Sequence, residues 1–122
     1  MSLQDRRAVA GALVADGKGI LADDETVGTL TKRFEALKIV STPESRRDYR
    51  ELLFTTPDAA NFISSVIMHD ETIRQNASDG VPLSDLLVRQ GVIPGIKVDL
   101  GASLLALTER LSPKVWTDCG TA

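Results

Sequence analysis

The sequence predicts an α/β protein built on a parallel sheet. Three short apolar segments, at 19–22, 62–68 and 95–98, are bounded by turn residues as buried strands are, and stretches with helical periodicity lie between them. Parallel neighbours need a crossover connection, which a helix usually supplies, so this alternation favours a parallel sheet. Ligands of such proteins bind beyond the carboxyl ends of the strands, and the residues there are therefore candidates for chemistry.

Length and composition bound the possible functions. The 122 residues suit one domain, and 43% hydrophobic with 25% charged residues is typical of a folded globular chain. The formal charge of −3 provides no basic field for a polyanionic duplex, so we expect no nucleic-acid partner. Neither a signal peptide nor an apolar run of bilayer-spanning length follows Met1, which predicts no membrane anchor and a cytoplasmic location.

Three helices are expected in the first half of the chain. Residues 3–15 are alanine-rich, and their apolar positions have the spacing of one helical face. From Thr26 onward, apolar residues recur at steps of three and four, as in an amphipathic helix. Thr42 and Pro43 indicate the start of a third helix. Its arginines at positions 46, 47 and 50 are expected on a solvent-exposed face.

The second half supplies the other two strands. The β-branched residues in the apolar segment 62–68 favour a strand. Turn residues then precede a helix whose expected N-cap is Ser84 and which ends at Gly91. The strand expected at 95–98 follows and carries Lys97 near its end.

Asp24 and Lys97 would end two strands of one sheet, so they could face the same cleft although they are far apart in the sequence. A carboxylate beside an ammonium keeps both groups charged and places a proton acceptor next to an anion-binding point. The alternative is that Asp24 or Glu25 only caps the following helix, because acidic residues stabilise a helix N-terminus.

Thr26 and Thr29 lie at the start of the second predicted helix. The free N–H groups and the dipole of a helix N-terminus favour a phosphate, to which hydroxyl groups can add hydrogen bonds; the alternative is simple N-capping. His69 is the only histidine, and Asp70 and Glu71 follow it. Because no second imidazole or thiolate is spaced to join them, we predict no metal site.

Five blocks of the sequence have an order that is typical of one family. They read GKGILADDETVGTLTKR, ESRRDYRELLFTTP, ISSVIMHDETIRQ, DGVPLSDLL and GVIPGIKVDLG, and the likeness extends from about Leu13 to Gly101. In this order the blocks resemble the N-terminal part of class I fructose-bisphosphate aldolases. The resemblance implies an α/β fold comprising about three βα units of a TIM (β/α)8 barrel.

The family reversibly cleaves fructose 1,6-bisphosphate to dihydroxyacetone phosphate and glyceraldehyde 3-phosphate in glycolysis. It uses a lysine Schiff base and no metal or other cofactor. By resemblance, Asp24 is the catalytic aspartate that ends the first strand and assists proton transfer. Thr26, Thr29 and Lys97 fall at positions that bind a phosphate of the sugar-phosphate substrate, and the parent enzyme is expected to be a homo-oligomer.

Two kinds of departure from the family are visible. Asp23 and Val27 stand where many members have alanine and threonine, and we expect them to crowd the phosphate loop. The Schiff-base lysine, its partner glutamate and a further catalytic lysine belong to later strands in the family, so we expect this chain alone to be inactive. The alternative is a non-catalytic sugar-phosphate-binding remnant, or a subunit whose barrel is completed by a second chain.

Residues 1–110 are assigned to the partial barrel and 111–122 to a tail outside the family. Suitable codons for Leu111 to Thr121 give, in a shifted frame, the string VTEGLDGLR, which resembles the next aldolase block. Trp116 has a single codon and Cys119 has two, yet both permit this string. We therefore expect a frameshift near Leu111, in the gene or in its assembled sequence, and we assign no function to Trp116 or Cys119.

Overall fold

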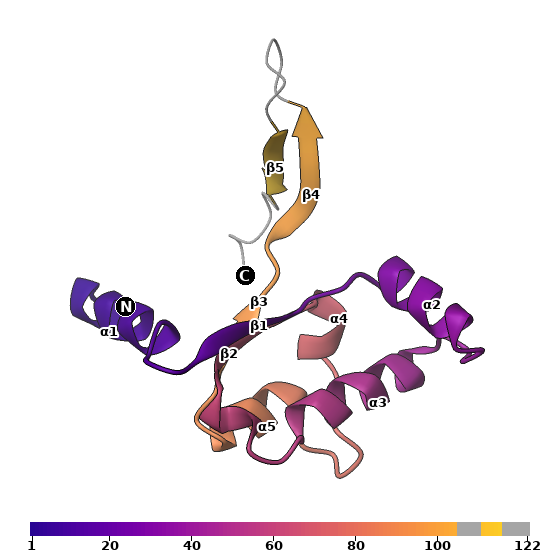
Figure 1. Cartoon of the computed structure of the whole chain (residues 1–122), viewed down its shortest axis with the longest axis horizontal. Helices are drawn as coiled ribbons and strands as arrows, with labels where there is room; N and C mark the ends of the chain where they lie inside the picture. The colour runs from indigo at the N-terminus through magenta and orange to yellow at the C-terminus, as the bar shows by residue number, and fades with distance from the viewer. Residues whose placement is uncertain (105–110, 116–122) are drawn as a thin grey trace.

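A computed structural model of the chain describes residues 1–104 and 111–115 (Figure 1). The elements, in chain order, are α1 (Leu3–Leu13), β1 (Gly19–Asp23), α2 (Val27–Ala36), α3 (Pro43–Phe54), the 3₁₀ turn η1 (Ala59–Asn61), β2 (Ile63–Met68), α4 (Asp70–Ile73), α5 (Leu83–Arg89), β3 (Ile93–Ile96), β4 (Asp99–Leu104) and β5 (Leu111–Val115). Of the tail assigned to 111–122, residues 116–122 lie outside this description. None of the helices within the described ranges is long and apolar enough to cross a bilayer.

The sheet has the strand order β1-β2-β3, and both pairings are parallel, as the sequence predicts. The third strand begins two residues earlier than expected, because Ile93–Ile96 pair with residues 65–68 of β2. Lys97 still donates its backbone N–H to the carbonyl of Met68 at 2.8 Å, so it directly follows the strand. Strands β4 and β5 form a separate antiparallel pair that extends away from this sheet (Figure 1).

Local sequence signals set most helix starts. Thr42 and Ser45 form a capping box with Pro43 in the first turn of α3, as expected. The expected cap at Ser84 is wrong, because α5 already begins at Leu83, which follows Pro82 and is fully buried. Burial of this leucine in the core therefore outweighs the capping preference of serine.

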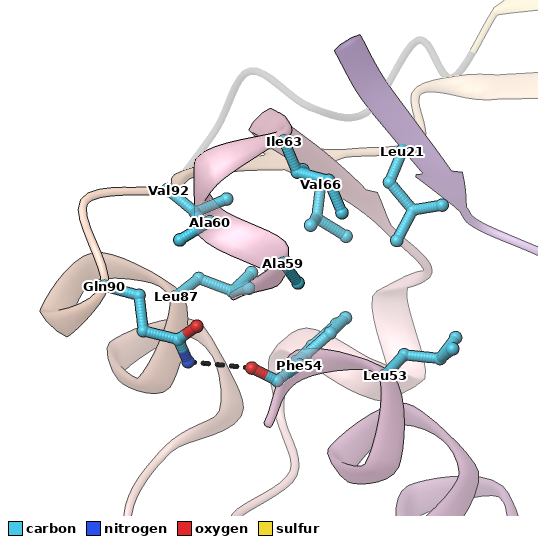
Figure 2. A pocket seen from close by; sticks show the side chains of 10 residues that line it. All are labelled: Leu21, Leu53, Phe54, Ala59, Ala60, Ile63, Val66, Leu87, Gln90 and Val92. Carbon is cyan, nitrogen blue, oxygen red and sulfur yellow. Dashed lines mark hydrogen bonds between the residues drawn. The ribbon is translucent and has the colours of Figure 1, made fainter. Parts of the chain in front are cut away.

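The core lies between one face of the sheet and the helices α3 and α5. Leu21 and Val66 approach it from the sheet, Phe54 from α3 and Leu87 from α5 (Figure 2). Gln90, after α5, donates a 2.7 Å hydrogen bond to the carbonyl of Phe54, the last residue of α3. These contacts leave a void of only about 10 Å³, so the layer is closely packed.

The opposite face of the sheet is open. Along β1, Leu21 and Asp23 turn towards the helices, whereas Ile20 and Ala22 are exposed. Successive side chains of a strand point to opposite faces, so Asp24 continues the open row of Ala22. Lys97 continues the row of Gly95, the register partner of Ile67, which is itself paired with Ala22. The strand period therefore assigns Asp24 and Lys97 to the open face and Asp23 to the covered one.

Gly95 lies where a side chain is expected to be accommodated only at a cost in stability. A Cβ atom at this position would lie 3.3 Å from the carbonyl oxygen of Val66 in the paired strand. Gly95→Ala is expected to lower the free energy of unfolding by about 1–2 kcal/mol, measured by urea denaturation, because the backbone of β2 must shift. Gly19→Ala, where a Cβ meets nothing within 4 Å, is the matched control. Equal effects of the two substitutions would contradict the steric argument.

Candidate functional site

Asp24 and Lys97 meet at the carboxyl ends of β1 and β3. The ammonium Nζ of Lys97 donates to Oδ2 of Asp24 at 3.0 Å, across 73 positions of sequence. Both side chains are partly buried, which strengthens their attraction relative to a fully solvated pair. The predicted juxtaposition is confirmed by this contact.

Asp99 is a second partner of Lys97. Its Oδ2 accepts from the same ammonium at 2.7 Å, while its Oδ1 accepts from the backbone N–H of Gly101. The hydrogen bonds to Asp99 and Asp24 raise the pKa of Lys97 above its ordinary value. The ammonium therefore stays charged at neutral pH, as binding of an anion requires.

Thr26 caps α2. Its Oγ1 accepts from the backbone N–H of Thr29 at 3.2 Å and lies 3.1 Å from the hydroxyl oxygen of the same residue. The alternative that Asp24 or Glu25 caps this helix is therefore wrong. Both threonines are exposed, and among the described residues no hydrogen bond joins their hydroxyls to Lys97. The four predicted site residues thus form two pairs: Asp24 with Lys97 beyond the ends of β1 and β3, and Thr26 with Thr29 at the start of α2.

A buried ionic cluster lies on the covered face of the sheet, next to the carboxyl end of β1. Asp23, which is 1% exposed, bonds through Oδ1 to Nη1 of Arg50, and the same nitrogen donates to Oε2 of Glu25 at 2.6 Å. Oδ2 of Asp23 is buried and finds no hydrogen-bond partner among the residues that the structure describes. Burial raises the pKa of Asp23 to about 7, although Arg50 opposes this shift. Asp23 therefore points to α3, and the expectation that it crowds the phosphate loop is wrong.

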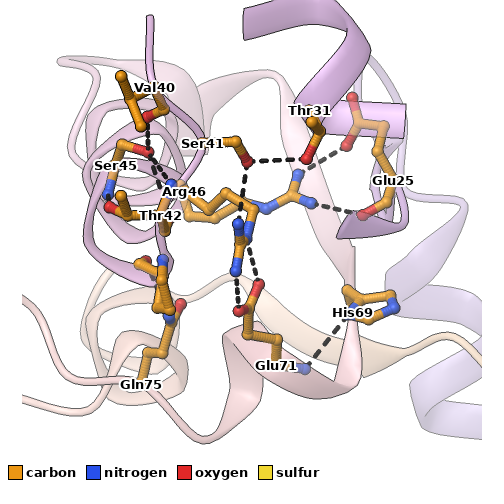
Figure 3. A network of polar contacts seen from close by, with 12 residues as sticks. Glu25, Thr31, Val40, Ser41, Thr42, Ser45, Arg46, His69, Glu71 and Gln75 are labelled. Atoms are coloured by element: carbon orange, nitrogen blue, oxygen red, sulfur yellow. Dashed lines mark hydrogen bonds and ion pairs between the residues drawn. The ribbon is translucent and has the colours of Figure 1, made fainter. Parts of the chain in front are cut away.

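A second buried arginine lies one turn earlier on α3. The guanidinium of Arg46 donates to both carboxylate oxygens of Glu71, at 2.8 and 2.6 Å, and also to Ser41 (Figure 3). The exposed arginine face expected for this helix is therefore wrong for Arg46 and Arg50, which are 7% and 1% exposed. Their spacing of four residues, continued by Phe54, was the available signal, because it places all three on one helical face.

His69 has a local role. Its Nδ1 accepts from the backbone N–H of Glu71 at 3.3 Å and so caps the short helix α4 (Figure 3). The described ranges contain no group of three or more histidine, cysteine, aspartate or glutamate side chains that could hold a metal ion.

The protein-family model described as "Glycolytic: Fructose-bisphosphate aldolase class-I" matches residues 5–117. The chain belongs to this family. The "Probable fructose-bisphosphate aldolase class 1" of Xanthomonas campestris is 52% identical over 106 residues, which cover 87% of this chain and 32% of that protein. The "Fructose-bisphosphate aldolase" of Echinococcus multilocularis is 53% identical over 100 residues, which cover 81% of this chain and 28% of that protein.

A solved aldolase has the same fold. The fructose-bisphosphate aldolase of Plasmodium falciparum, determined with TRAP and a small-molecule inhibitor, superposes with a TM-score of 0.84 at 42% sequence identity. The superposition covers 92% of this chain and 33% of the solved one. The predicted fold is thereby confirmed. The present chain is a partial TIM barrel, and it spans about a third of the length of its relatives.

The family match to 5–117 includes the first residues of the segment that the sequence analysis assigns to a tail. The boundary at residue 110 and the frameshift near Leu111 stay predictions.

Proposed function

We propose that the chain is the segment of a class I fructose-bisphosphate aldolase that carries the first aspartate and one phosphate-binding edge of its active site. The contact between Lys97 and Asp24 at 3.0 Å supports this proposal, because it unites on the open sheet face an anion-binding ammonium and a proton acceptor. The reaction of the whole enzyme is the reversible cleavage of fructose 1,6-bisphosphate.

Each residue has a distinct task in this proposal. Lys97 binds one phosphate of the sugar through its ammonium, and the hydroxyl groups of Thr26 and Thr29 add hydrogen bonds at the N-terminus of α2. Asp24, beside this point, accepts and returns a proton at the substrate carbon chain during C–C cleavage. Proximity of the two functions orients a phosphorylated sugar so that its reacting carbon lies near the carboxylate.

Covalent catalysis needs an amine that forms a Schiff base with the substrate ketone, with loss of water. In the family this lysine is carried by a later strand than β3, so we propose that this chain alone performs no turnover. The open sheet face, and the edges of β1 and β3 that no strand of the described residues pairs, favour completion by further barrel strands. A sugar-phosphate-binding remnant, or a subunit completed by a second chain, is the competing proposal.

Lys97→Met is expected to weaken the binding of dihydroxyacetone phosphate by about 10- to 100-fold, because a charge-assisted hydrogen bond contributes about 1.5–3 kcal/mol. Isothermal titration calorimetry on the 122-residue chain measures this change. Lys18→Met is the matched control, since Lys18 donates to the carbonyl of Ala60 near the opposite end of β1. Affinity that is independent of Lys97 would contradict the site.

Borohydride reduction separates covalent from non-covalent binding. With dihydroxyacetone phosphate present, reduction of a Schiff base leaves a stable secondary amine that adds mass to the lysine. We expect no such product on this chain, measured by intact mass spectrometry. A labelled lysine would show that the chain itself supplies the nucleophile.

A further inference from the structure

We propose that Arg50 is a positioning residue of the anion site: its guanidinium holds the loop between β1 and α2, so that Asp24 keeps its contact with Lys97 and Thr26 keeps its place at the start of α2. The inference rests on the proposed function, because it concerns how the same site is held in shape.

The grip of Arg50 on the loop is direct. Its Nη2 donates to the backbone carbonyl oxygen of Glu25 at 3.0 Å, and its Nη1 donates to Oε2 of the same residue at 2.6 Å. Glu25 is the residue between Asp24 and Thr26. One planar guanidinium therefore fixes both the main chain and the side chain at the centre of the loop.

The guanidinium is itself held in place. Asp23, the last residue of β1, binds Nη1 from the strand, and Arg50 is anchored on α3 with 1% of its surface exposed. Arg33 of α2 pairs with the other carboxylate oxygen of Glu25. Glu25 is thus bound by arginines from two helices, α2 and α3. Arg50 thereby ties the loop between β1 and α2 to helix α3.

A comparison with Arg46 distinguishes a positioning role of Arg50 from a contribution to stability alone. It lies one turn from Arg50 on the same helix, is also buried, and also holds a glutamate with two hydrogen bonds. Its partner Glu71 belongs to α4, however, and Arg46 makes no hydrogen bond to the loop between β1 and α2 among the described residues. Loss of either arginine leaves a carboxylate without its partner, the buried Asp23 or the partly buried Glu71, but only loss of Arg50 releases the loop.

The test compares Arg50→Gln with Arg46→Gln in the 122-residue chain. Two quantities are measured: the ¹⁵N order parameters of residues 24–26, and the dissociation constant for inorganic phosphate. In Arg50→Gln we expect the order parameters to fall from the rigid range near ~0.85 to below ~0.6, and phosphate binding to weaken by about 10-fold. In Arg46→Gln we expect the order parameters to stay in the rigid range near ~0.85 and the dissociation constant to stay within about twofold of the parent value, although the urea midpoint falls.

Two further variants sharpen the test. Arg50→Lys keeps the charge but cannot bond the carbonyl and carboxylate of Glu25 with one rigid fork, so we expect loop order and affinity between those of the parent and of Arg50→Gln. Glu25→Gln keeps the backbone carbonyl and removes the carboxylate charge. It is expected to change both quantities in the same direction and to a smaller extent, and it decides the matter if Arg50→Gln does not fold.

The outcomes distinguish the positioning role of Arg50 from the proposed function of the site. Unchanged loop order in Arg50→Gln, or an equal loss of loop order and affinity in Arg46→Gln, would refute the positioning role. If the parent chain shows no saturable phosphate binding while Arg50→Gln still loosens the loop, the proposed function fails and the hold of Arg50 on the loop stands.

Discussion

The free energy of unfolding is expected to decline by up to ~3 kcal/mol as the pH rises from about 5 to about 7.5, and Asp23→Asn is expected to remove this decline. Burial raises the pKa of Asp23 from 3.8 to about 7. Between these values the folded chain binds a proton that the unfolded chain has released, so stability falls with rising pH. Each pH unit between about 5 and the folded pKa of about 7 lowers the free energy by about 1.4 kcal/mol, which sets the upper bound for this range.

Two partly buried carboxylates, Glu25 and Glu71, titrate in a different pH range. For Glu25, hydrogen bonds from Arg50 and other groups outweigh burial and lower the pKa, and the hydrogen bond from Arg46 lowers the pKa of Glu71. Their contribution is present above about 4.5 and is lost in more acidic solution. The groups around Asp23 that carry or can acquire charge are Arg50 and Tyr49 on α3, Glu25 on the loop, Arg33 on α2 and, across Arg50, Glu71 on α4.

Urea denaturation of the parent chain, Asp23→Asn and Asp16→Asn across this range measures the effect. Asp16 is exposed and serves as the matched control. Parallel profiles for the parent and Asp23→Asn would contradict the assignment of the slope to Asp23.

Phe54→Ala is expected to lower the free energy of unfolding by about 3–5 kcal/mol, the usual range for removal of a buried phenylalanine. Phe54 is 2% exposed at the end of α3, and its ring contacts the layer shared by β2 and α5 (Figure 2). The surrounding void is about 10 Å³, so the substitution opens a new cavity rather than enlarging an existing one.

Phe62→Ala is the matched control, because it removes the same side chain from an exposed position. Phe62 is 68% exposed just before β2, so its truncation is expected to change stability by less than about 0.5 kcal/mol. Thermal or urea denaturation measures both variants. A cost for Phe62 similar to that for Phe54 would show that the residue before β2 is buried in solution.

The alternation of strands and helices, and the placement of Asp24 and Lys97 at strand ends, could be predicted from the sequence. Both follow from short-range rules: apolar runs bounded by turns, and side chains that alternate along a strand. The start of α3 at Thr42 and Pro43 was equally local. The exact register of β3 was not predictable in this way, because it depends on which residues of β2 it pairs with.

The burial of Arg46 and Arg50 could not be predicted from polarity, which argues for solvent exposure. Their burial depends on carboxylates from other elements, Glu71 on α4 and the pair Asp23 and Glu25 at the end of β1. Ionised groups are buried where partners of opposite charge neutralise them, and such partners are known only once the strand ends are placed in space. The part of the site that could not be predicted from the sequence is therefore the layer of buried arginines and carboxylates that holds it in place.

The strand order has a consequence for synthesis of the protein. Because β1, β2 and β3 adjoin in the order in which the ribosome makes them, each new strand can add to a neighbour that has already emerged. In a closed eight-stranded barrel, however, the free edge of β1 is paired only by the last strand made. The outer edge of the strand that leads to Asp24 is therefore the last strand edge to be paired. A nascent chain can associate edge to edge there for the longest time.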